Sequence, residues 1–242
     1  TVNTGAVDDL HAVADLCEQH GIWFHVDGAI GAIAMLSDVV RPLLSGIERA
    51  DSIAMDLHKW MHIPFEVGCV LVKKPAAQLE TFSLMPPYLK SGDTEGGMAT
   101  GGHWFSEYGV QLSRGFRALK VWMTIKEHGT ERLGRMISRN VEQAYYLAGL
   151  IDEHALLERI APVGMDIVCY RYNPGNLDED ALNALNSSIL VQLQERGIAA
   201  PSYTTLEGRY CIRVAIANFR STRADFDLLV AQTLALAEEL SG

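Results

Sequence analysis

Two stretches decide the fold of this chain: HVDGA at residues 25–29 and DSIAMDLHKW at residues 51–60. In each, a short, largely apolar run is followed by a polar side chain, Asp27 after the first run and Lys59 shortly after the second. Short apolar runs are typical of strands in parallel sheets, and open α/β sheets bind ligands beyond the carboxyl ends of their strands. The sequence therefore predicts an α/β fold in which an acid and a lysine meet at one edge of a sheet.

The residues around these stretches predict alternating helices and strands. Residues 8–20 are expected to form an amphipathic helix that ends at Gly21, because apolar residues recur there at helical spacing and glycine favours the end of a helix. A strand at residues 22–26, buried on both faces, should follow. Residues 41–48 are expected to form another helix and residues 68–72 a further strand, as in a parallel α/β sheet.

The middle of the chain changes character at a glycine-rich run. Residues 90–102 hold several glycines and are expected to form a specially shaped loop. A long helix should resume near Ser106 and end at Gly129, with a second helix over residues 130–152. The expected buried stripe of the first helix consists of Val110, Phe116, Leu119, Trp122 and Ile125.

The last part of the chain is expected to form a separate small α+β domain. Its pattern predicts a strand at residues 165–172, a helix at 177–196, a strand at 210–217 and a final helix at 222–240. The expected division is therefore a larger unit over residues 1–130 and a small C-terminal domain over 131–242.

Composition narrows the possible functions. The chain has 242 residues, 48% of them hydrophobic, and a formal net charge of −10. This length can bury a core, and the negative balance argues against a broad nucleic-acid or anionic-membrane surface. The longest uncharged apolar run, near residues 28–37, is far below the ~20 residues of a membrane helix. The scattered cysteines form no Cys-x-x-Cys pair, which suits reduced thiols in a cytoplasm; they are Cys17, Cys69, Cys169 and Cys211.

The acid and the lysine together indicate one chemistry. A lysine amine forms a Schiff base with a carbonyl cofactor. An aspartate opposite keeps a pyridine nitrogen protonated, so that the ring can take up electrons. Asp27 and Lys59 at adjacent strand ends are therefore what pyridoxal 5'-phosphate requires.

These stretches closely resemble those of the group II pyridoxal-phosphate amino-acid decarboxylases, which include the aromatic-amino-acid and glutamate decarboxylases. The similarity continues through residues 72–74, 87–90 and 117–122 and then fades into the C-terminal part. The resemblance implies a fold type I (aspartate aminotransferase-like) architecture. Residues 1–130 would be part of its large mixed-sheet domain, and residues 131–242 its small C-terminal domain.

The resemblance also implies a role for each matching residue. Lys59 would carry the Schiff base, and Asp27 would pair with the pyridinium nitrogen. Ala29 would lie against the ring face, and Asp56 would lie near the phosphate. His58 would contact the cofactor or the bound substrate.

A further implied residue is Tyr88, which matches a tyrosine on a loop over the active site. In such decarboxylases this tyrosine is thought to deliver a proton to Cα after carbon dioxide leaves, whereas relatives that make aldehydes carry phenylalanine there. Tyr88 therefore favours simple decarboxylation of an L-amino acid to its amine, with the glycine-rich run as a lid. An aromatic amino acid is the first expected substrate, ahead of glutamate, histidine, diaminobutyrate and cysteine sulfinate. The resemblance also implies a homodimer with the active site at its interface.

The chain departs from the family pattern in two places. Val2 stands where relatives have a threonine near the cofactor, so that hydroxyl is lost or supplied by a neighbour such as Thr4. Gly115 stands where relatives often have an arginine. Relatives also have a long segment before the position of Thr1, so the chain is expected to be the C-terminal portion of such an enzyme and inactive alone.

Two alternatives of other classes remain open on the sequence. His25, Asp27, His58 and His62 could supply nitrogen and carboxylate ligands to the metal of a hydrolase. Such a site would leave Lys59 without a role. The other alternative is a decarboxylase-like domain kept for assembly without activity.

Overall fold

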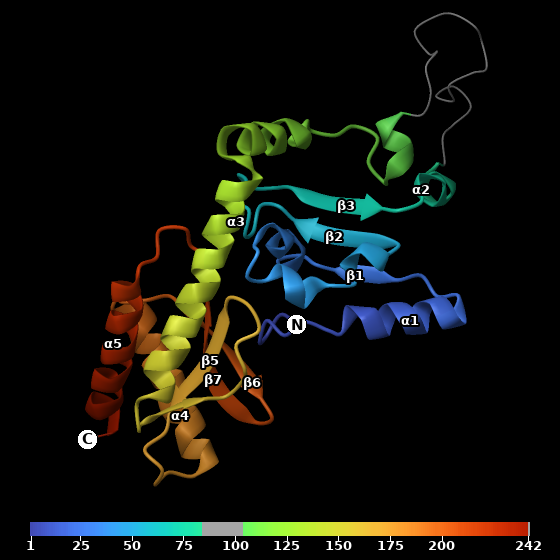
Figure 1. The fold of residues 1–242 in the computed structure, drawn as a ribbon. Helices are drawn as coiled ribbons and strands as arrows, with labels where there is room; N and C mark the ends of the chain where they lie inside the picture. Colours follow the sequence, from blue (N-terminus) through green and yellow to red (C-terminus); the bar gives the residue numbers. More distant parts are fainter. Residues whose placement is uncertain (84–103, 242) are drawn as a thin grey trace, which may run out of the picture.

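The first of two sheets carries the residues that the sequence singled out (Figure 1). The structure is a computed structural model, and it describes residues 1–83 and 104–241. The first sheet has the order β1 (His25–Asp27), β2 (Ser52–Asp56) and β3 (Gly68–Val72). β1 and β2 are parallel, and β2 and β3 are antiparallel. The α/β fold is confirmed, but the sheet is mixed because the short connection after β2 brings β3 straight back beside it.

Helix α1 (Leu10–His20) forms where the sequence predicts it. The side chain of Asp9 accepts a hydrogen bond from the backbone N–H of Ala12, and Gly21 ends the helix in the left-handed conformation. The expected buried face is only partly correct, because Val13 and Leu16 are exposed. The helix instead buries Leu10 and Ala14.

Two further expectations near the first sheet were wrong. β1 begins only at His25, and both Ile22 and Trp23 are exposed, so the run is not buried on both faces. The predicted helix over residues 41–48 is broken into two short 3-10 turns, η2 (Arg41–Leu44) and η3 (Ile47–Arg49). The break lies at Gly46, whose φ of 99° no right-handed helix allows.

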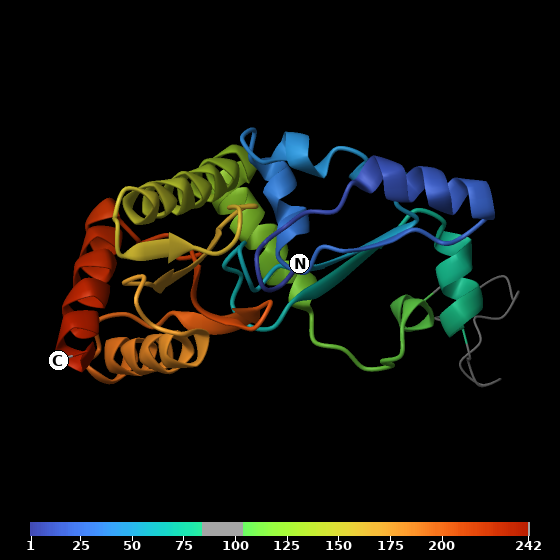
Figure 2. The ribbon, with the colours of Figure 1, turned by 90° about the horizontal axis from the view of Figure 1, so that it is seen from below.

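The long helix α3 (Arg117–Asp152) runs past both sheets (Figures 1 and 2). It is interrupted at Gly129, with φ 69° and ψ 159°, as the sequence predicted. Beyond this kink it packs closely on the 3-10 segment η1 (Gly31–Leu36). A Cβ on Gly134 would lie 2.1 Å from the backbone oxygen of Leu36, so only glycine permits this approach.

The expected buried stripe on this helix was also wrong. Helix α2 (Pro75–Phe82) ends well before this region. Residues 105–108 form only the short 3-10 turn η5 (Phe105–Tyr108), and the described residues between this turn and Arg117 form no helix. In this chain the stripe lies on an uncovered surface. Its exposed members are Val110, Phe116, Leu119, Trp122 and Ile125.

The second sheet lies in the C-terminal part and is antiparallel throughout. Its order is β4 (Leu157–Arg159), β5 (Ile167–Tyr172), β7 (Arg209–Ala215) and β6 (Ser202–Leu206). The sequence predicted β5 and β7 but neither β4 nor β6. The predicted helices are present as α4 (Glu179–Glu195) and α5 (Arg223–Ser241). These helices and the last turns of α3 enclose the largest apolar core with the sheet.

The first residues of the chain are attached to this second sheet. Arg213 of β7 donates hydrogen bonds to the backbone oxygens of Val2 and Asn3 at 2.7 and 3.0 Å. The chain then passes to α1 beside the first sheet, so the N-terminal segment bridges the two sheets (Figure 1). Among the described residues, no helix is long and apolar enough to cross a membrane.

Candidate active site

Hydrogen bonds join the carboxyl ends of β1 and β2 into one edge. Asp27 lies opposite Ala54 in the parallel register. The backbone N–H of Gly28 donates to the oxygen of Ala54 at 2.9 Å, and that of Asp56 donates to the oxygen of Ala29 at 3.0 Å. The turn after β1 therefore follows the end of β2 closely. Both strands deliver their polar residues to the same place, as the sequence predicted.

The turn after β1 packs closely on the following residues of η1. A Cβ on Gly28 would lie 2.4 Å from that of Ala32, so this position requires glycine. Asp27 Oδ1 accepts a hydrogen bond from the backbone N–H of Ala29 at 3.2 Å. This bond orients the carboxylate while the side chain stays exposed. Asp27 is therefore positioned and still accessible to a ligand.

Lys59 lies in a tight turn just beyond β2. Its backbone N–H donates to the oxygen of Asp56 at 3.0 Å, and its Nζ lies 2.6 Å from Asp56 Oδ2. The side chains of Lys59 and Asp56 are 40% and 31% exposed. Ion pairs at this exposure contribute at most about 1 kcal/mol. The amine is therefore held near the sheet edge by a partner that it can leave at little cost.

His58 points to a different part of the turn. Its Nδ1 lies 3.0 Å from the backbone nitrogen of Val67, whose oxygen already accepts a hydrogen bond from the N–H of Leu57. Nδ1 lies equally close, at 3.0 Å, to that oxygen, so the backbone of Val67 occupies this ring nitrogen in either tautomer. The ring also packs edge-on against Phe65 at 4.9 Å. The backbone of Val67 and the ring of Phe65 therefore set the orientation of His58.

Sequence reasoning missed the support beneath this turn. Trp60 is fully buried, and its Nε1 donates to Asn140 Oδ1 of α3 at 3.1 Å. Asn140 Nδ2 in turn donates to the backbone oxygen of Asn218 at 3.1 Å and to Gln143 Oε1 at 3.2 Å. One signal could have revealed it, because Asn140 is a polar residue within the buried stripe of α3.

The structure places most of the expected site residues together. Asp27, Ala29, Asp56 and Lys59 meet at the sheet edge, and His58 lies beside them on the same turn. Tyr88 and the glycine-rich run lie outside the described residues.

The metal alternative finds no support in the described part of the chain. The ring of His62 packs against Phe219 at 5.2 Å. No group of three or more His, Cys, Asp or Glu side chains there could hold an ion.

The departure at Val2 leaves an exposed side chain, and the hydroxyl of Thr4 pairs with that of Thr1 at 2.9 Å.

The donor set at the sheet edge fits pyridoxal phosphate. Lys59 offers a primary amine for its aldehyde carbon, and Asp27 offers a carboxylate for its ring nitrogen from the adjacent strand. The close turn at Gly28 presents the small side chain of Ala29 beside them, where a flat ring can approach.

Comparison with known proteins agrees with this chemistry. Residues 1–173 match the model of the pyridoxal-dependent decarboxylase conserved domain. The chain is 37% identical over 242 residues to the aromatic-L-amino-acid decarboxylase of Bacillus atrophaeus, covering all of this chain and 50% of the relative. It is 32% identical over 220 residues to tyrosine decarboxylase 4 of Petroselinum crispum, covering 89% of this chain and 43% of the relative. The chain therefore spans about half the length of the curated relatives it matches.

Solved structures show the same architecture. The crystal structure of Oryza sativa TDC with PLP and tryptamine matches with a TM-score of 0.88 and 25% identity, over 100% of this chain and 50% of that chain. The glutamate decarboxylase domain of a Vibrio parahaemolyticus diaminobutyrate-pyruvate transaminase and L-2,4-diaminobutyrate decarboxylase matches with a TM-score of 0.80 and 29% identity, over 98% and 44%. Both matches support a fold type I architecture.

Proposed function

The chain belongs to the pyridoxal-dependent decarboxylase family, and from this premise we propose that it serves the decarboxylation of an L-amino acid to its amine and carbon dioxide. The observation that carries the proposal is the meeting of Asp27 and Lys59 at one sheet edge, with the turns that hold them joined by the bond from Asp56 to Ala29. In this family, pyridoxal phosphate supplies a carbonyl that condenses with amines and a ring that accepts the electron pair of the broken bond.

Each residue at the edge then has a defined task. Lys59 would hold the cofactor through Nζ, and when it is free of the cofactor its amine would be able to take up or return a proton. Asp27 would pair with the ring nitrogen, and its carboxylate is already oriented by the backbone N–H of Ala29. Asp56 retains Lys59 as an ion-pair partner when the amine is free. His58 would contact the cofactor or the bound substrate through Nε2, since the backbone of Val67 occupies Nδ1.

Proton delivery to the substrate is assigned to Tyr88. A phenol there would protonate Cα after carbon dioxide departs, which completes simple decarboxylation to the amine. Phenylalanine at this position should divert the product toward aldehyde.

The remaining assignments follow from the relatives. We propose an aromatic amino acid as the substrate class, because two of the matched relatives are named as aromatic-amino-acid and tyrosine decarboxylases. We further propose a homodimer with the site at its interface, a cytoplasmic location, and a division into a large unit over residues 1–130 and a small domain over 131–242.

Chemical trapping tests the central role of Lys59. The protein saturated with pyridoxal phosphate is reduced with borohydride, digested and mapped by mass spectrometry. A pyridoxyl group should appear on the peptide that holds Lys59 and disappear in Lys59→Arg. The matched control is Lys74→Arg, which changes an exposed lysine beyond β3 and should keep the label. Labelling that persists in Lys59→Arg, or an unmodified Lys59 in the saturated protein, would overturn the proposal.

A further inference from the structure

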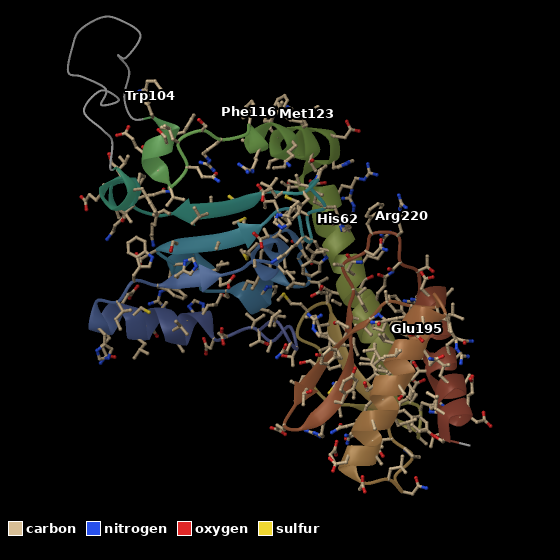
Figure 3. All side chains as sticks on the ribbon, turned by 180° about the vertical axis from the view of Figure 1, so that it is seen from behind. His62, Trp104, Phe116, Met123, Glu195 and Arg220 are labelled. Carbon is tan, nitrogen blue, oxygen red and sulfur yellow. The ribbon has the colours of Figure 1, made fainter. Side chains whose placement is uncertain are left out.

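A cavity lies beside the residues that follow Lys59. This cavity has a volume of about 720 Å³ and is formed by the residues after Lys59, the kinked part of α3 and the loop after β7. Asp27, Asp56 and Lys59 do not line it. Figure 3 shows His62 and Arg220 close together beside α3, where that loop meets the helix. The size suits a small organic ligand, since such sites typically occupy roughly 300–1,000 Å³.

One wall of the cavity carries concentrated positive charge. Arg132, Arg135 and Arg139 line it at positions i, i+3 and i+7 of α3, which places them on one face of the helix. Among the described residues, no carboxylate forms an ion pair with Arg132 or Arg139. Arg135 has only a long contact of 3.7 Å with the exposed Glu131. Their guanidinium groups therefore keep hydrogen-bonding capacity for an anion.

The wall formed by His62 and the loop after β7 is aromatic. The rings of His62 and Phe219 meet there edge-on at 5.2 Å, and Leu133 and Met136 of α3 add apolar surface to the cavity. Desolvation lowers the pKa of His62, and a hydrogen bond from the ring to the backbone of Ala217 opposes this in part. The shift favours the neutral ring, which offers a flat surface. An aromatic ligand could pack on this wall in an edge-on or offset geometry.

Hydrogen bonds connect the loop after β7 to helix α3. Arg139 donates to the backbone oxygen of Phe219, and Asn140 Nδ2 donates to that of Asn218 at 3.1 Å. The loop that carries Phe219 is thus fixed to the helix that carries the arginines. A site whose parts are already in place loses little free energy to ordering on binding.

We propose that this cavity binds a small aromatic anion, an aryl group bearing a phosphate or carboxylate, with the acid group on Arg132 and Arg135 and the ring on His62 and Phe219. The site is tied to the catalytic turn, because the backbone N–H of His62 donates to the oxygen of Lys59 at 3.1 Å. A ligand packed on His62 therefore contacts the turn that positions the lysine.

Calorimetric titration with phenyl phosphate tests the proposal. We expect one molecule bound per chain, at least tenfold weaker binding of inorganic phosphate, and no detectable binding of benzyl alcohol, which lacks the charge. Arg132→Gln and Arg135→Gln should each weaken phenyl phosphate by about tenfold, the size of one lost charge-assisted hydrogen bond. Both side chains are exposed, so neither change should disturb folding.

Two matched variants locate the binding. Lys126→Gln removes an exposed cation of the same helix outside the cavity and should leave the affinity unchanged. Lys59→Ala should also leave it unchanged, because Lys59 does not line the cavity. Absent binding, an affinity in both arginine variants equal to that of the unchanged protein, or binding lost in Lys59→Ala would each overturn the proposal.

Discussion

Replacing Asn140 by alanine should destabilise the fold strongly, because this side chain lies between the Lys59 turn and the second sheet. It is fully buried and bonds to Trp60, Gln143 and the backbone of Asn218. Alanine removes both the amide oxygen and the amide nitrogen. The indole N–H of Trp60 then remains buried with no partner from α3, and the oxygen of Asn218 loses its donor.

The expected cost follows from the buried indole N–H, because Asn218 is exposed. Leaving one buried polar group unsatisfied costs about 1–3 kcal/mol, so Asn140→Ala should lose about 2 kcal/mol of unfolding free energy. The assay is equilibrium unfolding in urea, followed by tryptophan fluorescence. Asn176→Ala, an exposed loop asparagine, serves as the control and should change stability by less than about 0.5 kcal/mol.

A double-mutant cycle separates the bond from general damage. Trp60→Phe, Asn140→Ala and the double variant should show a coupling energy of about 1 kcal/mol or more, because the second change finds the partner already lost. A coupling energy near zero would refute the view that this bond joins the turn to α3. A loss below about 1 kcal/mol in Asn140→Ala would refute the estimate of its cost.

Two further changes probe the core and the helix packing. Burial raises the pKa of Asp166 to about 6, opposed by its own backbone N–H and by Arg213. Uptake of a proton by Asp166 therefore adds about 3 kcal/mol to the unfolding free energy below pH 4. This stabilisation is lost as the pH rises to 6. Asp166→Asn should flatten the fall in urea stability between pH 4 and 6, and an unchanged slope would contradict this assignment. Gly134→Ala should destabilise by about 2 kcal/mol or more, because its Cβ would meet Leu36 O. Gly149→Ala, with open space on the same helix, should be neutral or stabilising by up to about 1 kcal/mol in thermal unfolding, and equal effects would count against the packing argument.

Elements with local signals could be predicted from the sequence. Helix α1 has its cap at Asp9 and its stop at Gly21, and the break in α3 has its glycine at 129. These signals act within a few residues, so they are readable without knowledge of the fold. The same holds for the placement of Asp27 and Lys59, since each directly follows or lies near the end of its own strand.

Elements that depend on distant partners could not be predicted. β4 is only three residues long, and β6 is a mostly exposed, polar strand that forms by pairing with β7. The stripe from Val110 to Ile125 shows a related limit. Helical spacing of apolar residues predicts a face that favours burial, but it does not say which layer covers that face, and in this chain the stripe is exposed.

In the candidate site, the residues proposed to bind the cofactor were easier to predict than the residues that hold the lysine turn in place. Lys59 and Asp27 could be proposed from the sequence because both lie next to strand ends. The groups that hold the turn come from far away: Val67 fixes the ring of His58, and Asn140 fixes Trp60 from a position 80 residues later. Asn140 also holds the loop after β7, which adds a contact from the second sheet. The lysine turn therefore depends on the whole chain from β1 to β7, and a change in the C-terminal part should reach it through Trp60.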